Sequence, residues 1–186
     1  MKRIICILLI LFALVALAGC KNNETDKPVP SGCDIEDSCA DERGENWKVS
    51  DLFNDDVVVY TMDEILAEFD KTAIIFYSFE DCPWCYDALP VLLDVIKDED
   101  IKVYYVAATR EERADGNPSY DKSMEFFREE VGEKMYIPFC AFLKDGVIVG
   151  SHTGTVEGHN AKETPINKEQ KEELFKIYQD LYNLIK

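Results

Sequence analysis

The stretch Phe79-Glu80-Asp81-Cys82-Pro83-Trp84-Cys85 is the most informative part of this 186-residue chain. It ends a β-branched and aromatic run that starts at Ile74, and it precedes a helical pattern from Tyr86 to Lys97. Two cysteines three positions apart in a first helical turn share one face, with Cβ atoms about 5–6 Å apart. A disulfide tolerates that separation. Because closing so short a loop gains little chain entropy, the pair is predicted to be a reversible redox couple and not a staple.

Cys82 is the predicted nucleophile, expected to be exposed at the helix start, with Cys85 more buried. The unpaired N–H groups and the positive dipole end of a helix favour a thiolate there and lower its pKa. A zinc half-site is the alternative, because this cysteine spacing also binds zinc. A structural zinc site needs four ligands, and the candidates elsewhere are Cys140, His152, His159 and two cysteines nearer the N-terminus. We expect no metal and no cofactor, Cys140 as a small buried hydrophobe, and both histidines at the surface.

The first nineteen residues predict export. Lys2 and Arg3 precede an unbroken apolar run from Ile4 to Ala16. This run is shorter than the roughly 20 residues that span a membrane, and it is typical of a secretory signal peptide. The following Leu17-Ala18-Gly19-Cys20 resembles the lipobox of bacterial lipoproteins. That resemblance implies cleavage before Cys20 and a lipid, labelled by palmitate, on its sulfur. An ordinary secretory signal followed by an incidental cysteine is the alternative.

The chain is therefore predicted to have three parts: a lipoprotein signal peptide (1–19), a flexible polar tether (20–46) and a single domain (47–186). Removing residues 1–19 takes away two positive charges and no negative ones, so the net charge changes from −17 to −19. So acidic a protein is not expected to bind nucleic acid, and its charge repels an anionic membrane surface. The lipid on Cys20 is expected to hold it at the extracytoplasmic face of the cell membrane.

Cys33 and Cys39 lie in the predicted tether. Because an exported location permits disulfides, a Cys33–Cys39 bridge is predicted as a second disulfide. A local structural loop is one interpretation of this bridge. A shuttle that exchanges with Cys82 is the other.

The domain pattern predicts the order β-α-β-α-β-α-β-β-α, with parallel crossovers first and an antiparallel hairpin later. Asp145-Gly146 is typical of the hairpin turn, and Asn167 with Gln170 resembles a capping box for the last helix. The predicted strands are 57–60, 73–79, 101–108, 136–143 and 147–152, and the predicted helices are 62–69, 86–97, 119–132 and one after Asn167.

This order, with the cysteine pair after a central strand, resembles the thioredoxin family, most securely from Ile74 to Gly154. Cys82-Pro83-Trp84-Cys85 matches the family's redox site, Pro90 its helix-kinking proline, and Ile137-Pro138 its cis-proline. The resemblance implies an α/β thioredoxin fold, a central mixed sheet flanked by helices. It also implies thiol–disulfide exchange with protein thiols and disulfides, catalysed by Cys82 and Cys85. Pro83, Trp84, Ile137 and Pro138 are then expected to contact the substrate.

Two departures from the family pattern bear on the direction of electron flow. Phe76 stands where the family has a buried acid, and Pro-Trp replaces Gly-Pro between the cysteines. In the family, that acid helps proton transfer to and from the second cysteine. Trp84 supplies no positive charge to Cys82, and the carboxylates of Glu80 and Asp81 oppose its thiolate. Both effects raise the Cys82 pKa and favour a reductase, supplied with electrons by a membrane partner or another thiol protein. The chain is also similar to exported, bacteriocin-accessory-like thioredoxins. A non-catalytic, surface-anchored binding or accessory module, serving bacteriocin export or immunity, is therefore the alternative function.

Overall fold

In the computed structural model, residues 32–34, 48–68, 70–108 and 118–186 are described, and the statements below concern these residues. Their centre is a five-stranded mixed sheet in the order β2-β4-β3-β6-β7. The pairs β2–β4 and β4–β3 are parallel, and β3–β6 and β6–β7 are antiparallel. The strands are β2 (Val57–Val59), β3 (Ala73–Ser78), β4 (Val103–Ala107), β6 (Phe139–Lys144) and β7 (Val147–Thr153).

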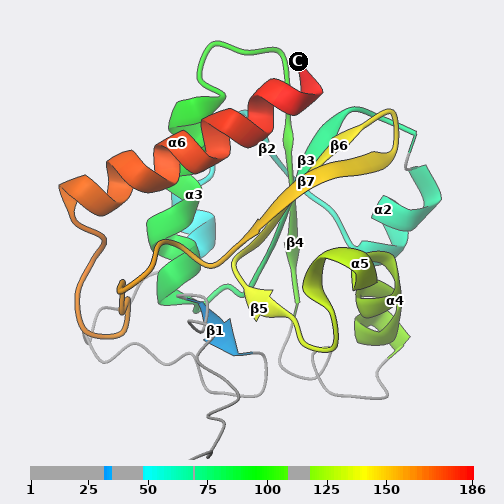
Figure 1. The fold of residues 1–186 in the computed structure, drawn as a ribbon. Coiled ribbons are helices and arrows are strands. Elements are labelled where there is room, and N and C mark those ends of the chain that lie inside the picture. Colours follow the sequence, from blue (N-terminus) through cyan, green and yellow to red (C-terminus); the bar gives the residue numbers. More distant parts are fainter. Residues whose placement is uncertain (1–31, 35–47, 69, 109–117) are drawn as a thin grey trace, which may run out of the picture.

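Helices cover the two faces of this sheet (Figure 1). One layer holds α3 (Pro83–Val95) and α6 (Lys168–Ile185), which pack against each other. The other layer holds α2 (Met62–Glu68), α4 (Pro118–Phe126) and α5 (Arg128–Val131), and a 3-10 helix, η1 (Val49–Leu52), contacts α3. The predicted fold class, a mixed α/β sheet flanked by helices with the cysteine pair at a helix N-terminus, is confirmed by this arrangement.

Strand β3 positions the cysteine pair. All six of its residues are buried, because neighbouring strands flank it on both edges and helices cover both faces. Phe76 at its centre lies opposite Tyr105 of β4 and Cys140 of β6. The chain leaves the end of this rigid strand and reaches Cys82 within four residues. The pair is therefore fixed to the most buried element of the sheet.

Three element boundaries differ from those predicted, each for a local reason. Helix α3 begins at Pro83 and not at Tyr86, because proline fits the first helical turn, where no N–H donor is needed. The predicted strand from Tyr136 is divided at Pro138, which has no N–H for the ladder, into β5 (Tyr136–Ile137) and β6. The predicted helix 119–132 is divided at Phe127, whose ring lies 4.9 Å from that of Phe139 in the core.

A short strand, β1 (Cys33–Asp34), forms where the sequence predicted part of a flexible tether. It pairs antiparallel with β5 in a separate two-stranded sheet, with Cys33 opposite Ile137 and Asp34 opposite Tyr136. Cys33 is 2% exposed. This segment is therefore docked on the domain at the edge next to Pro138.

The last helix is capped as predicted. The side chain of Asn167 accepts the Gln170 N–H at 2.9 Å, and the Gln170 side chain accepts the Asn167 N–H at 3.0 Å. Across the described ranges, we find no helix with the length and apolar character needed to cross a membrane. The predicted signal peptide and the predicted lipidation site, Cys20, lie outside these ranges.

Candidate functional site

The two cysteines of the predicted redox site are held together at the start of α3. Cys82 is the N-cap residue, and the backbone N–H of Cys85 donates a hydrogen bond to its Sγ at 3.2 Å. Both are free thiols in this structure. The first turn of the helix therefore aligns the two sulfur-bearing residues on one face, as the spacing predicted.

The expected exposure of Cys82 is wrong, and so is its expected lowered pKa. Cys82 and Cys85 are both 0% exposed. Burial raises the pKa of the Cys82 thiol well above its ordinary value, and the side chain of Cys85 adds to the rise. The backbone N–H groups of Trp84 and Cys85 act in the opposite direction. The helix N-terminus does stabilise a thiolate, but the loss of solvation outweighs it.

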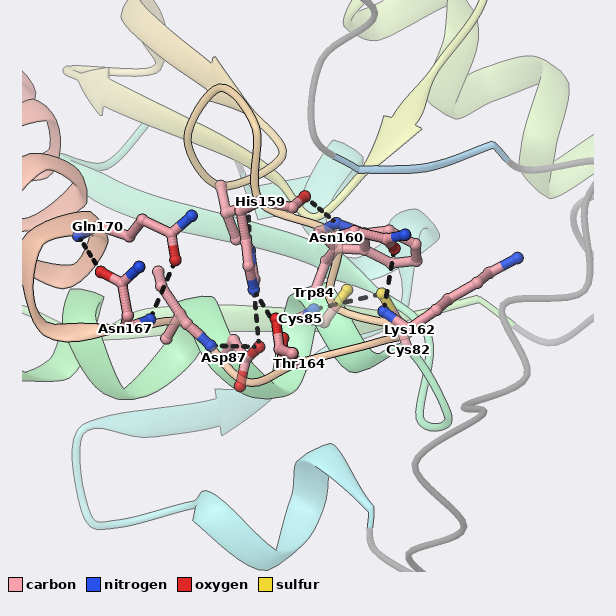
Figure 2. A network of polar contacts seen from close by, with 12 residues as sticks. Cys82, Trp84, Cys85, Asp87, His159, Asn160, Lys162, Thr164, Asn167 and Gln170 are labelled. Atoms are coloured by element: carbon pink, nitrogen blue, oxygen red, sulfur yellow. Dashed lines mark hydrogen bonds and ion pairs between the residues drawn. The ribbon is translucent and has the colours of Figure 1, made fainter.

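A loop between β7 and α6 covers this end of α3 (Figure 2). The indole N–H of Trp84 donates to the carbonyl of His159 at 3.3 Å, and Trp84 is only 7% exposed. In the same loop, the side-chain oxygen of Asn160 accepts the Lys162 N–H at 3.3 Å. Trp84, predicted to contact the substrate, therefore contacts the chain's own loop.

A buried histidine and a buried aspartate fix this loop to α3. His159 Nε2 lies 3.3 Å from Oδ2 of Asp87, and its Nδ1 lies 2.7 Å from the Thr155 hydroxyl (Figure 2). The same Asp87 oxygen accepts the Ile166 N–H at 3.1 Å. His159 is 4% exposed, so the prediction that it lies at the surface is wrong. His152 is half-buried and packs edge-on against Tyr178, again away from open surface.

Sequence reasoning missed Asp87 altogether. Its only signal was a carboxylate in the otherwise apolar stretch that follows Cys85. The partner, His159, lies 72 residues further along the chain, and no spacing rule links the two. Only the fold brings them together.

A second polar cluster approaches the thiols from the loop before α3. Tyr105 on β4 donates to Ser78 at 3.3 Å and to Glu80 at 3.4 Å. The Glu80 side chain also accepts the Ser50 N–H at 3.3 Å and the Ser50 hydroxyl, so η1 holds it in place. Burial raises the pKa of Tyr105 well above its ordinary value, and the nearby Cys85, Glu80 and Cys82 add to the rise. Phe76, at the position of the family's acid, is fully buried in the core.

The predicted substrate edge, Ile137–Pro138, is paired with another part of the chain. The Ile137–Pro138 bond is cis, as the resemblance implied, and Ile137 is paired with Cys33 of β1. All four residues predicted to contact the substrate are buried: Pro83, Trp84, Ile137 and Pro138. In this structure the predicted substrate edge is therefore paired with the chain's own β1.

The remaining cysteines differ in state. Cys33 is disulfide-bonded, while Cys140 is a free thiol on β6, fully buried as predicted, and burial raises its pKa. The predicted partner of Cys33, Cys39, lies outside the described residues, so the pairing stays a prediction. Within the described parts of the chain, no three His, Cys, Asp or Glu side chains form a group suited to a metal ion.

Comparisons with known proteins add little. No family model matches the sequence, and no curated protein does. Among solved structures, the chain is similar to a thioredoxin from Aeropyrum pernix, with 19% identity and a TM-score of 0.42 over 69% of this chain and 86% of that one. So weak a likeness carries no argument about function. The fold class therefore rests on the strand order and on the position of the cysteine pair.

The buried dithiol predicts slow and pH-dependent alkylation. Because the Cys82 pKa is raised, little thiolate exists at pH 7, and the rate with iodoacetamide should rise by about tenfold per pH unit up to at least pH 9. Mass spectrometry of quenched digests of the full chain measures it, with the chain unfolded in guanidinium as the control. A folded-state rate at pH 7 equal to the unfolded one would contradict this.

The contact between Asp87 and the loop predicts a clear cost for its removal. Asp87→Ala leaves the Ile166 N–H without its buried acceptor and removes the carboxylate from His159 Nε2, which keeps only the Thr164 carbonyl at 3.2 Å. This should lower the free energy of unfolding by about 1–3 kcal/mol. Asp94→Ala, at an exposed position of the same helix, is the matched control and should change it by less than about 0.5 kcal/mol. Urea unfolding compares the two, and equal effects would refute the role of Asp87.

Proposed function

We propose that this protein is a thiol–disulfide oxidoreductase that exchanges disulfides with protein substrates through Cys82 and Cys85. The observation that carries the proposal is the free dithiol at the N-terminus of α3, with the Cys85 N–H on the Cys82 sulfur. Two cysteines on the first turn of one helix, close enough to form a disulfide, are the arrangement that exchange requires.

The reaction uses the thiolate of Cys82. It attacks one sulfur of a substrate disulfide, the other substrate sulfur leaves as a thiolate, and a mixed disulfide forms. Cys85 then attacks the Cys82 sulfur and releases the reduced substrate, which leaves Cys82 and Cys85 oxidised. The hydrogen bond from the Cys85 N–H stabilises the Cys82 sulfur whenever it carries negative charge.

The raised pKa of Cys82 favours the reductase direction. A strong oxidant has a stabilised thiolate in its reduced form, and burial disfavours that thiolate here. The closed site also means that Cys82 reaches the disulfide of a separate protein only when the covering segments open. Electrons are then supplied by a membrane partner or by another thiol protein.

The burial of Cys82 also favours a second candidate function. In that case the domain is a surface-anchored binding or accessory module, of the kind that serves bacteriocin export or immunity, and its cysteines never turn over.

Insulin reduction separates the two candidates. The wild-type chain, supplied with dithiothreitol, should precipitate insulin well above the uncatalysed rate, and Cys82→Ser should fall to that rate. Cys140→Ala, which removes a buried thiol on another strand, is the matched control and should stay active. The dithiol potential should lie nearer the roughly −270 mV of thioredoxin than the roughly −120 mV of strong oxidases. An inactive chain with a potential below about −300 mV would leave only the binding module.

The location belongs to the same proposal. We propose that the chain is exported and held at the extracytoplasmic face of the cell membrane by a lipid on Cys20. The support is the sequence of residues 1–20, with its basic start, apolar run and lipobox-like end.

Metabolic labelling tests the anchor. Radiolabelled palmitate should enter the wild-type chain in bacterial cells and be lost in Cys20→Ala, because the thioether needs the cysteine sulfur. Cys6→Ala, inside the segment that would be removed, is the control and should keep the label. Persistent labelling of Cys20→Ala would refute the lipid claim.

A further inference from the structure

Strand β1 pairs with the edge of β5 as a bound peptide would. An extended peptide that joins a sheet edge is held by backbone pairing, and Cys33–Asp34 pairs antiparallel with Tyr136–Ile137 in this way. The register places Cys33 opposite Ile137, next to Pro138. The residue that occupies the predicted substrate edge is therefore itself a cysteine.

The fit at this edge is close. A Cβ atom added to Gly32 would lie 2.8 Å from the carbonyl oxygen of Ile137 and 3.2 Å from the Cα of Gly154. Both neighbours are backbone atoms and cannot move aside as a side chain could. Gly154 is itself tied to this edge, because its N–H donates to the Pro138 carbonyl at 2.7 Å. The glycine before Cys33 is thus what lets this strand approach.

The docked cysteine lies at the same end of the molecule as the dithiol. In Figure 1, β1 and the first turn of α3 lie at the same end of the domain. Cys33 is 2% exposed, and like Cys82 and Cys85 it is part of the hydrophobic core of the domain. It is disulfide-bonded, whereas Cys82 and Cys85 are free. The core thus holds an oxidised sulfur at the Ile137–Pro138 edge and a reduced pair at the start of α3.

We propose that the disulfide of Cys33 is an internal substrate of the Cys82–Cys85 dithiol, which makes Cys33 a third redox-active cysteine. This inference rests on the proposed thiol–disulfide exchange and extends it. It favours the shuttle over the local structural loop, the two interpretations that the sequence left open.

The exchange takes two steps, and its bonds, electrons and protons balance. The Cys82 thiolate attacks the Cys33 sulfur, the bond from Cys33 to its partner cysteine breaks, and that partner leaves as a thiolate that takes up a proton. The Cys85 thiolate then attacks the Cys82 sulfur, which forms the Cys82–Cys85 disulfide and releases Cys33 as a thiol. Two electrons and two protons pass from the dithiol to the Cys33 disulfide, and the reverse sequence returns them.

An internal substrate explains how Cys82 can be buried and still take part in exchange. A thiol that is 0% exposed cannot reach the disulfide of a folded partner. The Cys33 disulfide is instead docked on the same chain, at the Ile137–Pro138 edge. The strand therefore offers an internal substrate to a buried dithiol.

Trapping in the full-length chain tests the exchange. In Cys85→Ser the mixed disulfide between Cys33 and Cys82 cannot be resolved. Maleimide, added slowly, alkylates the cysteine that Cys33 was bonded to, so the original disulfide cannot form again. Non-reducing peptide mapping should then find a Cys33–Cys82 linkage that grows with time, at a rate independent of protein concentration. The matched control is the Cys82→Ser/Cys85→Ser chain, which should give none. Absence of the linkage in a Cys85→Ser or Cys85→Ala chain that folds would overturn the proposal.

A variant of the docking contact tests the geometry separately. Gly32→Val in the Cys85→Ser background places a side chain against the Ile137 carbonyl, so the linkage should form at least about tenfold more slowly. An unchanged rate would overturn the docked geometry as the route of exchange.

Insulin reduction by the wild-type chain separates this inference from the proposed function. Insulin activity without the Cys33–Cys82 linkage would overturn the shuttle alone. A chain that forms the linkage but does not reduce insulin would support the internal exchange and overturn the reduction of protein substrates.

Discussion

The hydrogen bond from the Cys85 N–H to the Cys82 sulfur, between two residues that are 0% exposed, is the interaction that the surrounding elements hold in place. It requires a helix that begins at Pro83, and that helix requires a strand end that delivers the chain to Cys82 at a fixed position. Strand β3 meets this need because it is buried on both faces and paired on both edges. The sheet is therefore the support of a two-sulfur site.

Closure changes the chemistry that this site can perform. A helix N-terminus alone would make Cys82 acidic and reactive. Burial reverses that effect and leaves a protonated thiol. The loop that Asp87 and His159 fix covers the first turn of α3, where Trp84 donates to it. Reactivity toward a separate protein is then governed by opening, since exposure would remove the largest cause of the raised pKa.

Much of the fold followed from local patterns. The buried strand before Cys82, the hairpin at Asp145-Gly146 and the capping box at Asn167 were all predictable, because each depends on neighbours within a few residues. The cysteine pair and the cis-proline were predictable from a motif. The burial of Cys82 was not, since it depends on a loop after β7 that begins 72 residues further along the chain. Long-range closure of this kind leaves no periodic signal in the sequence.

His159 and Cys33 illustrate the same limit. A histidine in a polar loop is most often solvated, and only its contact with Asp87 makes it a buried anchor. Cys33 lies in a stretch rich in polar residues, typical of a tether, and its docking depends on the absence of a side chain at Gly32. In both cases the local composition predicted exposure, and a tertiary contact outweighed it.

The central claim is that closure keeps Cys82 protonated at neutral pH. It is tested most directly by titrating the ultraviolet absorbance of the thiolate in the reduced wild-type chain and subtracting the titration of Cys82→Ser. The account predicts a difference curve whose midpoint lies above the ordinary cysteine value of about 8.5. A midpoint below about 7, as an open helix N-terminus would give, would contradict it.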